Sequence, residues 1–164
     1  MPASVAQTPG RVSGLVVLSA LFLLLIGVLT VLVGTALVLG GGILGQLGSA
    51  DTDTGIFAGT GLFGALGGIV AGVGVVMIVW ALLEILGGFG MLFRRAWGRA
   101  IGFFVGLIGA VFTGLVFVGA IRALSDTTDS GSAAVGIAIA LVVFLGYLLT
   151  VVALARGGAH FRRG

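Results

Sequence analysis

The chain contains no cysteine, no lysine and no asparagine, and only 8% of its residues are charged. Without cysteine it can form neither disulfides nor thiolate metal sites. A soluble domain carries about 25% charged residues because water must wet its surface. This shortage of charge therefore argues against a soluble catalytic domain. The missing lysine and asparagine, with abundant alanine, glycine, valine and arginine, are typical of a GC-rich bacterial genome.

Long apolar runs are what the chain has instead. Hydrophobic residues make up 59% of it, and the mean hydropathy is +1.34. Each run reaches the roughly 20 residues that a helix needs to cross a bilayer. The first run is much longer than the roughly 7 to 15 apolar residues of a signal peptide, so we expect an uncleaved span. The runs are 15–39, 62–93, 101–121 and 133–155.

These runs predict an all-α integral membrane protein, a four-helix bundle with antiparallel up-down topology. The connections are too short for a separate soluble domain of about 50 residues or more, so residues 1–164 are expected to form a single transmembrane domain. The candidate external loops, 46–61 and 125–132, are rich in residues that favour turns. The Asp-Thr-Asp-Thr string of the first loop lacks the spacing of a calcium-binding loop. We expect no metal site and no cofactor.

The arginines predict the orientation of the bundle. Positively charged residues are retained on the cytoplasmic side of membrane spans, and seven of the eight arginines fall on one side of the predicted bundle. Both termini and the turn between the second and third runs are thus expected in the cytoplasm, with the protein in the bacterial inner membrane. The net charge of +3 is interpreted as orientation, not as nucleic-acid binding. The seven are Arg11, Arg94, Arg95, Arg99, Arg156, Arg162 and Arg163.

Glycine recurs every fourth residue in two of the runs. Within lipid, small residues at this spacing let helix backbones approach closely. The repeats predict packing stripes, used either within the bundle, which we favour, or for homo-oligomerisation or docking to a membrane-protein partner. The candidate packing residues are Gly64, Gly68 and Gly72 in the second run and Gly102 and Gly106 in the third.

Glu84 is the one charged residue well inside an apolar run. It lies ten residues before Arg94, or about 15 Å along a helix, which places it in the inner half of the bilayer. A carboxyl at that depth is costly and is expected to be protonated, paired or facing a wet cavity. Two interpretations stay open: a proton or cation relay or ligand contact, and a structural hydrogen bond to another helix.

The depth of other polar side chains suggests partners for Glu84. Tyr147, Thr150 and Ser19 lie at a similar distance from the arginines that flank their own runs, if the spans alternate in direction. We expect Tyr147 to be the best partner. His160 lies in the basic tail and contributes to no proton path.

The segment 84–99 combines this acid with a glycine-rich helix end and an R-x-W-x-R turn formed by Arg95, Trp97 and Arg99. It resembles small uncharacterised bacterial four-span membrane proteins that share this plan. A more distant resemblance is to DoxX-like four-span proteins, which lack the tryptophan turn. Neither resemblance implies a reaction. We expect Trp97 to anchor the turn at the membrane interface while Arg94, Arg95 and Arg99 meet anionic headgroups of the lipid bilayer.

Two function classes compete. The first is a non-enzymatic accessory or structural helix-packing protein, which the glycine stripes and the scarcity of polar groups in the spans favour. The second is a small oligomeric transporter or channel with Glu84 facing the path. An enzyme is a weaker third interpretation, because the spans hold no paired histidines, no metal cluster and no nucleophile with its base.

Overall fold

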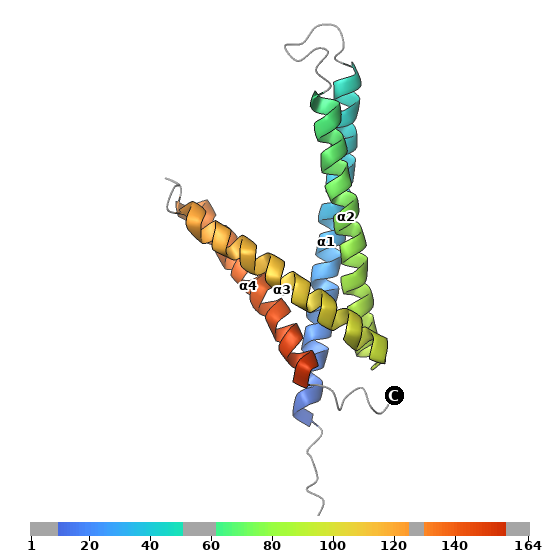
Figure 1. The fold of residues 1–164 in the computed structure, drawn as a ribbon, viewed down its shortest axis with the longest axis vertical. Helices are drawn as coiled ribbons and strands as arrows, with labels where there is room; N and C mark the ends of the chain where they lie inside the picture. Colours follow the sequence, from blue (N-terminus) through green and yellow to red (C-terminus); the bar gives the residue numbers. More distant parts are fainter. Residues whose placement is uncertain (1–9, 51–61, 125–129, 157–164) are drawn as a thin grey trace, which may run out of the picture. The chain divides into compact units, whose positions relative to one another are not determined.

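The computed structural model describes residues 10–50, 62–124 and 130–156, and these form four helices (Figure 1). They are α1 (Gly10–Ala50), α2 (Leu62–Leu92), α3 (Ala96–Leu124) and α4 (Ser130–Arg156). Both prolines of the chain, Pro2 and Pro9, precede α1, so no helix is interrupted by one. The predicted all-α class is confirmed for the described residues.

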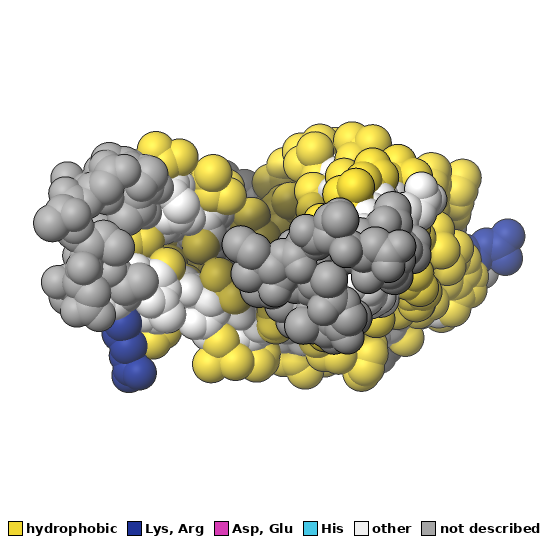
Figure 2. Space-filling view, turned by 90° about the horizontal axis from the view of Figure 1, so that it is seen from above, with side chains coloured by type: hydrophobic (Ala, Val, Ile, Leu, Met, Phe, Trp, Pro, Cys, Tyr) yellow, Lys and Arg dark blue, Asp and Glu magenta, His cyan; other side chains and the backbone are white. Residues whose placement is uncertain are grey.

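Each helix contains a stretch that is long and apolar enough to cross a membrane. These stretches are Gly14–Leu47, Gly64–Leu92, Ala96–Arg122 and Ala134–Arg156. Large hydrophobic side chains are exposed along all four helices, and in Figure 2 they cover most of the described surface in view, with basic groups only at its margins. Soluble proteins rarely expose apolar patches of this extent. The surface fits lipid, and the chain has the character of a multi-pass membrane protein.

Three helices, α1, α3 and α4, are longer than the apolar runs predict, α1 most of all, whereas α2 matches its run to within one residue. Its 41 residues extend about 60 Å, roughly twice the thickness of the hydrocarbon core. The first apolar run ends at Leu39, before Gly40, Gly41 and Gly42. Glycine is a poor helix former. The helix continues because Gly41 lies directly against the α2 backbone, and this contact outweighs the local propensity.

One compact unit, Leu25–Ile85, contains the second part of α1 and most of α2. The two helices run antiparallel, since Gly27 lies beside Ala81 while Gly41 lies beside Gly67. They also lie side by side over this length in Figure 1. Close backbone contact at the glycines, flanked by the side chains of Ile78 and Ile85, characterises this pair.

The other compact unit, Met1–Leu24 with Leu86–Gly164, contains the start of α1, the end of α2, and α3 and α4. Helices α3 and α4 are antiparallel, because Gly102 lies beside Leu154 while Gly114 lies beside Phe144. A short turn, Phe93 to Arg95, joins α2 to α3. The buried hydrophobic side chains of this unit are Val16, Ala20, Leu23, Met91, Val105, Ala110, Tyr147, Ala153 and Leu154.

Candidate functional site

Small residues repeat every seven positions along the contact between α1 and α2. A Cβ on Gly41 would lie 2.6 Å from the Gly67 carbonyl oxygen, and one on Gly74 would lie 2.6 Å from the Gly34 carbonyl oxygen. A seven-residue repeat keeps one face of a helix turned toward its partner. The contact therefore runs continuously along the pair: Gly27, Gly34 and Gly41 on α1 meet Ala81, Gly74 and Gly67 on α2.

The four-residue stripe predicted on α2 does not make this contact. An added Cβ on Gly64, Gly68 or Gly72 would meet nothing within 4 Å, so within its own unit this stripe lies outside the contact with α1. Whether these three glycines pack within the bundle, the use we favoured, or against another chain stays a prediction. The packing face is rotated away from them, and the sequence signal for it was the seven-residue spacing shared by α1 and α2.

The glycines predicted on α3 lie against side chains. A Cβ on Gly102 would come within 3.1 Å of the Met91 sulfur, and one on Gly106 within 3.3 Å of Thr150 and Val151. These contacts join α3 to the end of α2 and to α4. Leucine at either position would need space that neighbouring side chains already occupy.

Glycines in the same unit also leave room for aromatic rings. A Cβ on Gly146 would collide with the ring of Phe22, and one on Gly109 would lie 2.6 Å from the ring of Tyr147. The rings of Phe22 and Tyr147 pack edge to face, with centroids 5.5 Å apart and planes at 89°, a favoured aromatic geometry. This cluster holds the start of α1 against α4, and Tyr147 against α3.

Glu84 is completely buried, with 0% of its surface exposed. Its Oε1 accepts a hydrogen bond of 2.9 Å from the indole Nε1 of Trp80, one turn earlier on α2. Residues four apart share a helix face, so this spacing was the signal for a partner that the depth argument did not name. The indole N–H supplies a donor to this buried carboxyl.

The three predicted partners of Glu84 belong to the other unit. Ser19 and Thr150 are both fully buried, and each hydroxyl donates a 2.9 Å hydrogen bond to a carbonyl four residues earlier in its own helix. Tyr147 is 4% exposed and lies in the aromatic cluster. Local bonds of this kind satisfy hydroxyl donors inside helices. Contact between Glu84 and these three side chains stays a prediction.

The turn between α2 and α3 is closed by a specific pattern of backbone hydrogen bonds. Arg95 N donates to Gly90 O at 2.9 Å and Arg94 N to Met91 O at 3.1 Å, which together form a Schellman motif. Arg94 has a φ of 54°, and within residues 10–50, 62–124 and 130–156 no other non-glycine residue has a positive φ. A left-handed conformation costs such a residue roughly 1–2 kcal/mol. Gly98 of α3 packs directly on the backbone of Gly90, so the end of α2 and the start of α3 are in close contact next to the turn.

The predicted interface anchors cluster at this turn. Arg94 and Arg95 are exposed, Arg99 is half-buried, and Trp97 is 47% exposed with one edge of its indole against Gly90. Phe93 is stacked on Phe89 with ring centroids 6.3 Å apart. Aromatic and basic side chains are thus presented together at one end of this unit.

Among the described residues, no group of three or more His, Asp or Glu side chains lies close enough to hold a metal ion. The geometry that stands out is packing: a continuous backbone contact in one unit, ring insertion in the other, and one buried carboxyl bonded within its own helix. Comparisons of the chain with protein families, with curated proteins and with solved structures give no match.

Proposed function

We propose that this chain is a non-enzymatic accessory or structural protein of the bacterial inner membrane, with four spans in an up-down bundle and both termini in the cytoplasm. The supporting observation is the seven-residue series of small contacts between α1 and α2, from Gly27 with Ala81 to Gly41 with Gly67. In lipid such contacts stabilise helix pairs by close van der Waals packing. Helices in this arrangement have little space for a solvated path.

The environment of Glu84 supports the same proposal. A carboxyl in a transport path must reach water or the transported ion, whereas Glu84 is 0% exposed and bonded to Trp80 of its own helix. A buried polar group with a fixed partner helps to specify one packing arrangement. Its role in the accessory protein is therefore structural.

The second candidate function is a small oligomeric transporter or channel with Glu84 facing the path. The observation that favours it is the acid itself, because an ionisable residue inside a span is costly and commonly belongs to an ion or proton pathway. This function requires Glu84 to become accessible in another conformation or in an oligomer.

Co-purification from native membranes after chemical cross-linking tests the accessory role. We expect a homo-oligomer or a second membrane protein in a fixed ratio to this chain. Two substitutions at glycines with open space around the added Cβ form a matched pair. Gly68→Leu adds bulk to the stripe of α2 and should disrupt the complex, whereas Gly136→Leu adds bulk on α4 and should not.

Flux measurements separate the two functions. Proteoliposomes that hold the wild-type chain alone are assayed for proton and monovalent-cation flux, next to the Glu84→Gln variant. Flux that the wild type supports and the variant lacks would establish the transporter. A chain that yields neither a defined complex nor an oligomer in native membranes would refute the accessory role.

A further inference from the structure

The turn between α2 and α3 places an arginine where a helix end ordinarily has glycine. Arg94 occupies the left-handed position of the Schellman motif, with φ 54°, and glycine fills this position most often because it has no Cβ. The chain has 32 glycines, so glycine is not scarce in it. Strained positions that persist in a fold are concentrated at functional sites. An arginine at this strained position therefore indicates a functional role for its side chain.

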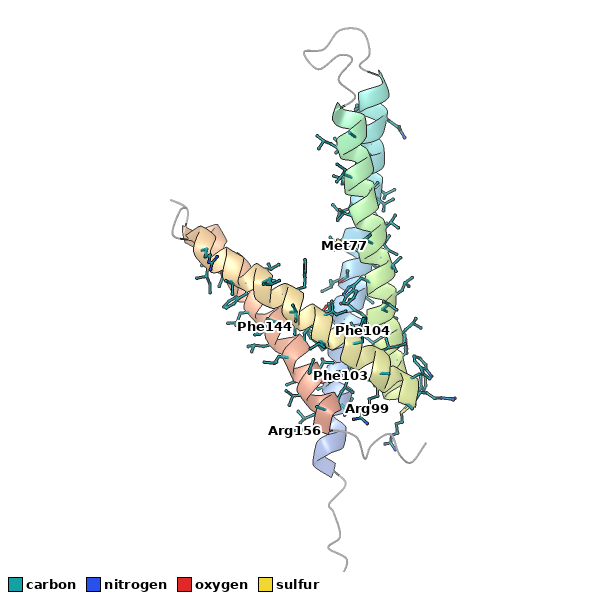
Figure 3. All side chains as sticks on the ribbon, in the orientation of Figure 1. Met77, Arg99, Phe103, Phe104, Phe144 and Arg156 are labelled. Atoms are coloured by element: carbon teal, nitrogen blue, oxygen red, sulfur yellow. The ribbon has the colours of Figure 1, made fainter. Side chains whose placement is uncertain are left out.

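Positive charge accumulates around Arg94 without acidic residues nearby in the sequence. Arg94 and Arg95 are exposed at the turn, and Arg99 follows in the first helical turn of α3. Arg156 ends α4 at the same end of this unit, since Leu154 lies beside Gly102, and Figure 3 shows Arg99 and Arg156 there. The sequence has no Asp or Glu from residue 85 to residue 125. A charge cluster of this composition favours an anionic ligand.

Apolar surface adjoins this charge. Phe93, next to Arg94 in the chain, is 71% exposed and stacked on Phe89, which is 46% exposed. Trp97 is anchored by its contact with Gly90. A ligand that satisfies the whole surface carries an anionic group next to hydrocarbon, and a phospholipid has this chemistry. Guanidinium groups bind phosphate oxygens in pairs, with defined geometry.

The geometry points to a binding site for an anionic phospholipid at the α2–α3 turn, with the guanidinium of Arg94 on the phosphate, Arg95 and Arg99 beside it, and acyl chain against Phe89 and Phe93. This site goes beyond general interface anchoring because it assigns one lipid to one residue. It also goes beyond the accessory role, since it requires only that the chain spans a membrane.

Native mass spectrometry of the full chain in detergent tests the site by titration with phosphatidylglycerol and, separately, phosphatidylcholine. We expect preferential binding of the first. Arg94→Gly should weaken phosphatidylglycerol binding about fivefold, the effect typical of one arginine at an anionic surface. The same variant should unfold at an equal or higher temperature without lipid, because glycine relieves the left-handed strain. Arg94→Lys keeps the charge but not the paired donors of a guanidinium, so its phosphatidylglycerol binding should lie between that of the wild type and that of Arg94→Gly.

Arg122→Gln is the matched control, because it removes one arginine from the opposite end of α3. It should bind phosphatidylglycerol as the wild type does. Undiminished binding by Arg94→Gly, or an equal loss in the Arg122→Gln control, would overturn the proposal, since either shows that charge acts diffusely. Equal binding of glycerol phosphate, which lacks acyl chains, would also overturn it in favour of a soluble phosphate. If no protein partner is found, the accessory role fails but the lipid-binding results are unaffected. The accessory role and the lipid site can therefore be refuted separately.

Discussion

Gly34 of α1 and Gly74 of α2 face each other so closely that a Cβ on Gly74 would lie 2.6 Å from the Gly34 carbonyl oxygen. At this distance the two helices touch backbone to backbone. The same relationship recurs one heptad away between Gly41 and Gly67. Glycine lowers helix propensity in water, but here it shortens the distance between helices and so increases their van der Waals contact.

The first prediction concerns this contact. Gly74→Ala should destabilise the protein by about 1–3 kcal/mol, because the new methyl group has no space against Gly34 and Val38. Gly72→Ala is the control on the same helix, where an added Cβ meets nothing within 4 Å. That control should be neutral or stabilising by up to about 1 kcal/mol. Thermal unfolding in detergent measures both, and equal midpoints would show that the α1–α2 contact is looser than described.

The second prediction concerns the insertion of Phe22 into the space above Gly146. Gly146→Ala should destabilise the protein by about 1–3 kcal/mol, because its methyl group collides with the Phe22 ring. In a Phe22→Ala background the same substitution should cost less than about 0.5 kcal/mol, since the ring is gone. Gly136→Ala, at an open position of α4, is the control. An unchanged cost in both backgrounds would mean that Phe22 does not occupy this space.

The third prediction separates charge from hydrogen bonding at position 84. Glu84→Gln keeps an acceptor for the indole N–H of Trp80 and should preserve folding. Glu84→Leu removes the acceptor and should be less stable than Glu84→Gln by about 1–3 kcal/mol, the cost of a buried unsatisfied donor. The stability difference between these two variants should shrink in a Trp80→Phe background. Thermal unfolding of the four variants is the measurement, and an undiminished difference would assign the cost to other contacts of Glu84.

The fourth prediction is the orientation. Reporter fusions after Ser49 and Thr128 should lie outside the cytoplasm, and fusions after Ala96 and Gly164 inside it, because seven of eight arginines are expected on the cytoplasmic side. Paired alkaline phosphatase and fluorescent-protein reporters give opposite signals for the two compartments. If Ala96 and Thr128 report the same side, the four-span topology is wrong.

Two glycine stripes with the same four-residue spacing have different surroundings in the structure. Four-residue spacing on α3 was visible in the sequence, and Gly102 and Gly106 do lie against other helices. The same spacing on α2 was equally visible, yet a Cβ added to Gly64, Gly68 or Gly72 would meet none of the described residues within 4 Å. Spacing shows that small residues share a face, but only the rotation of the helix about its axis determines which face meets another helix.

The sequence by itself determined the class of protein, the number of candidate spans and the unusual status of Glu84. Those properties follow from the length of apolar runs and the cost of charge in lipid, which depend on residues near in sequence. The tertiary structure decided the extension of α1 through Gly41, which of the small-residue repeats meets another helix, the insertion of Phe22 and the left-handed backbone of Arg94. Each of these depends on where a second segment lies within a few ångströms, and residue types alone do not encode that distance in any local pattern.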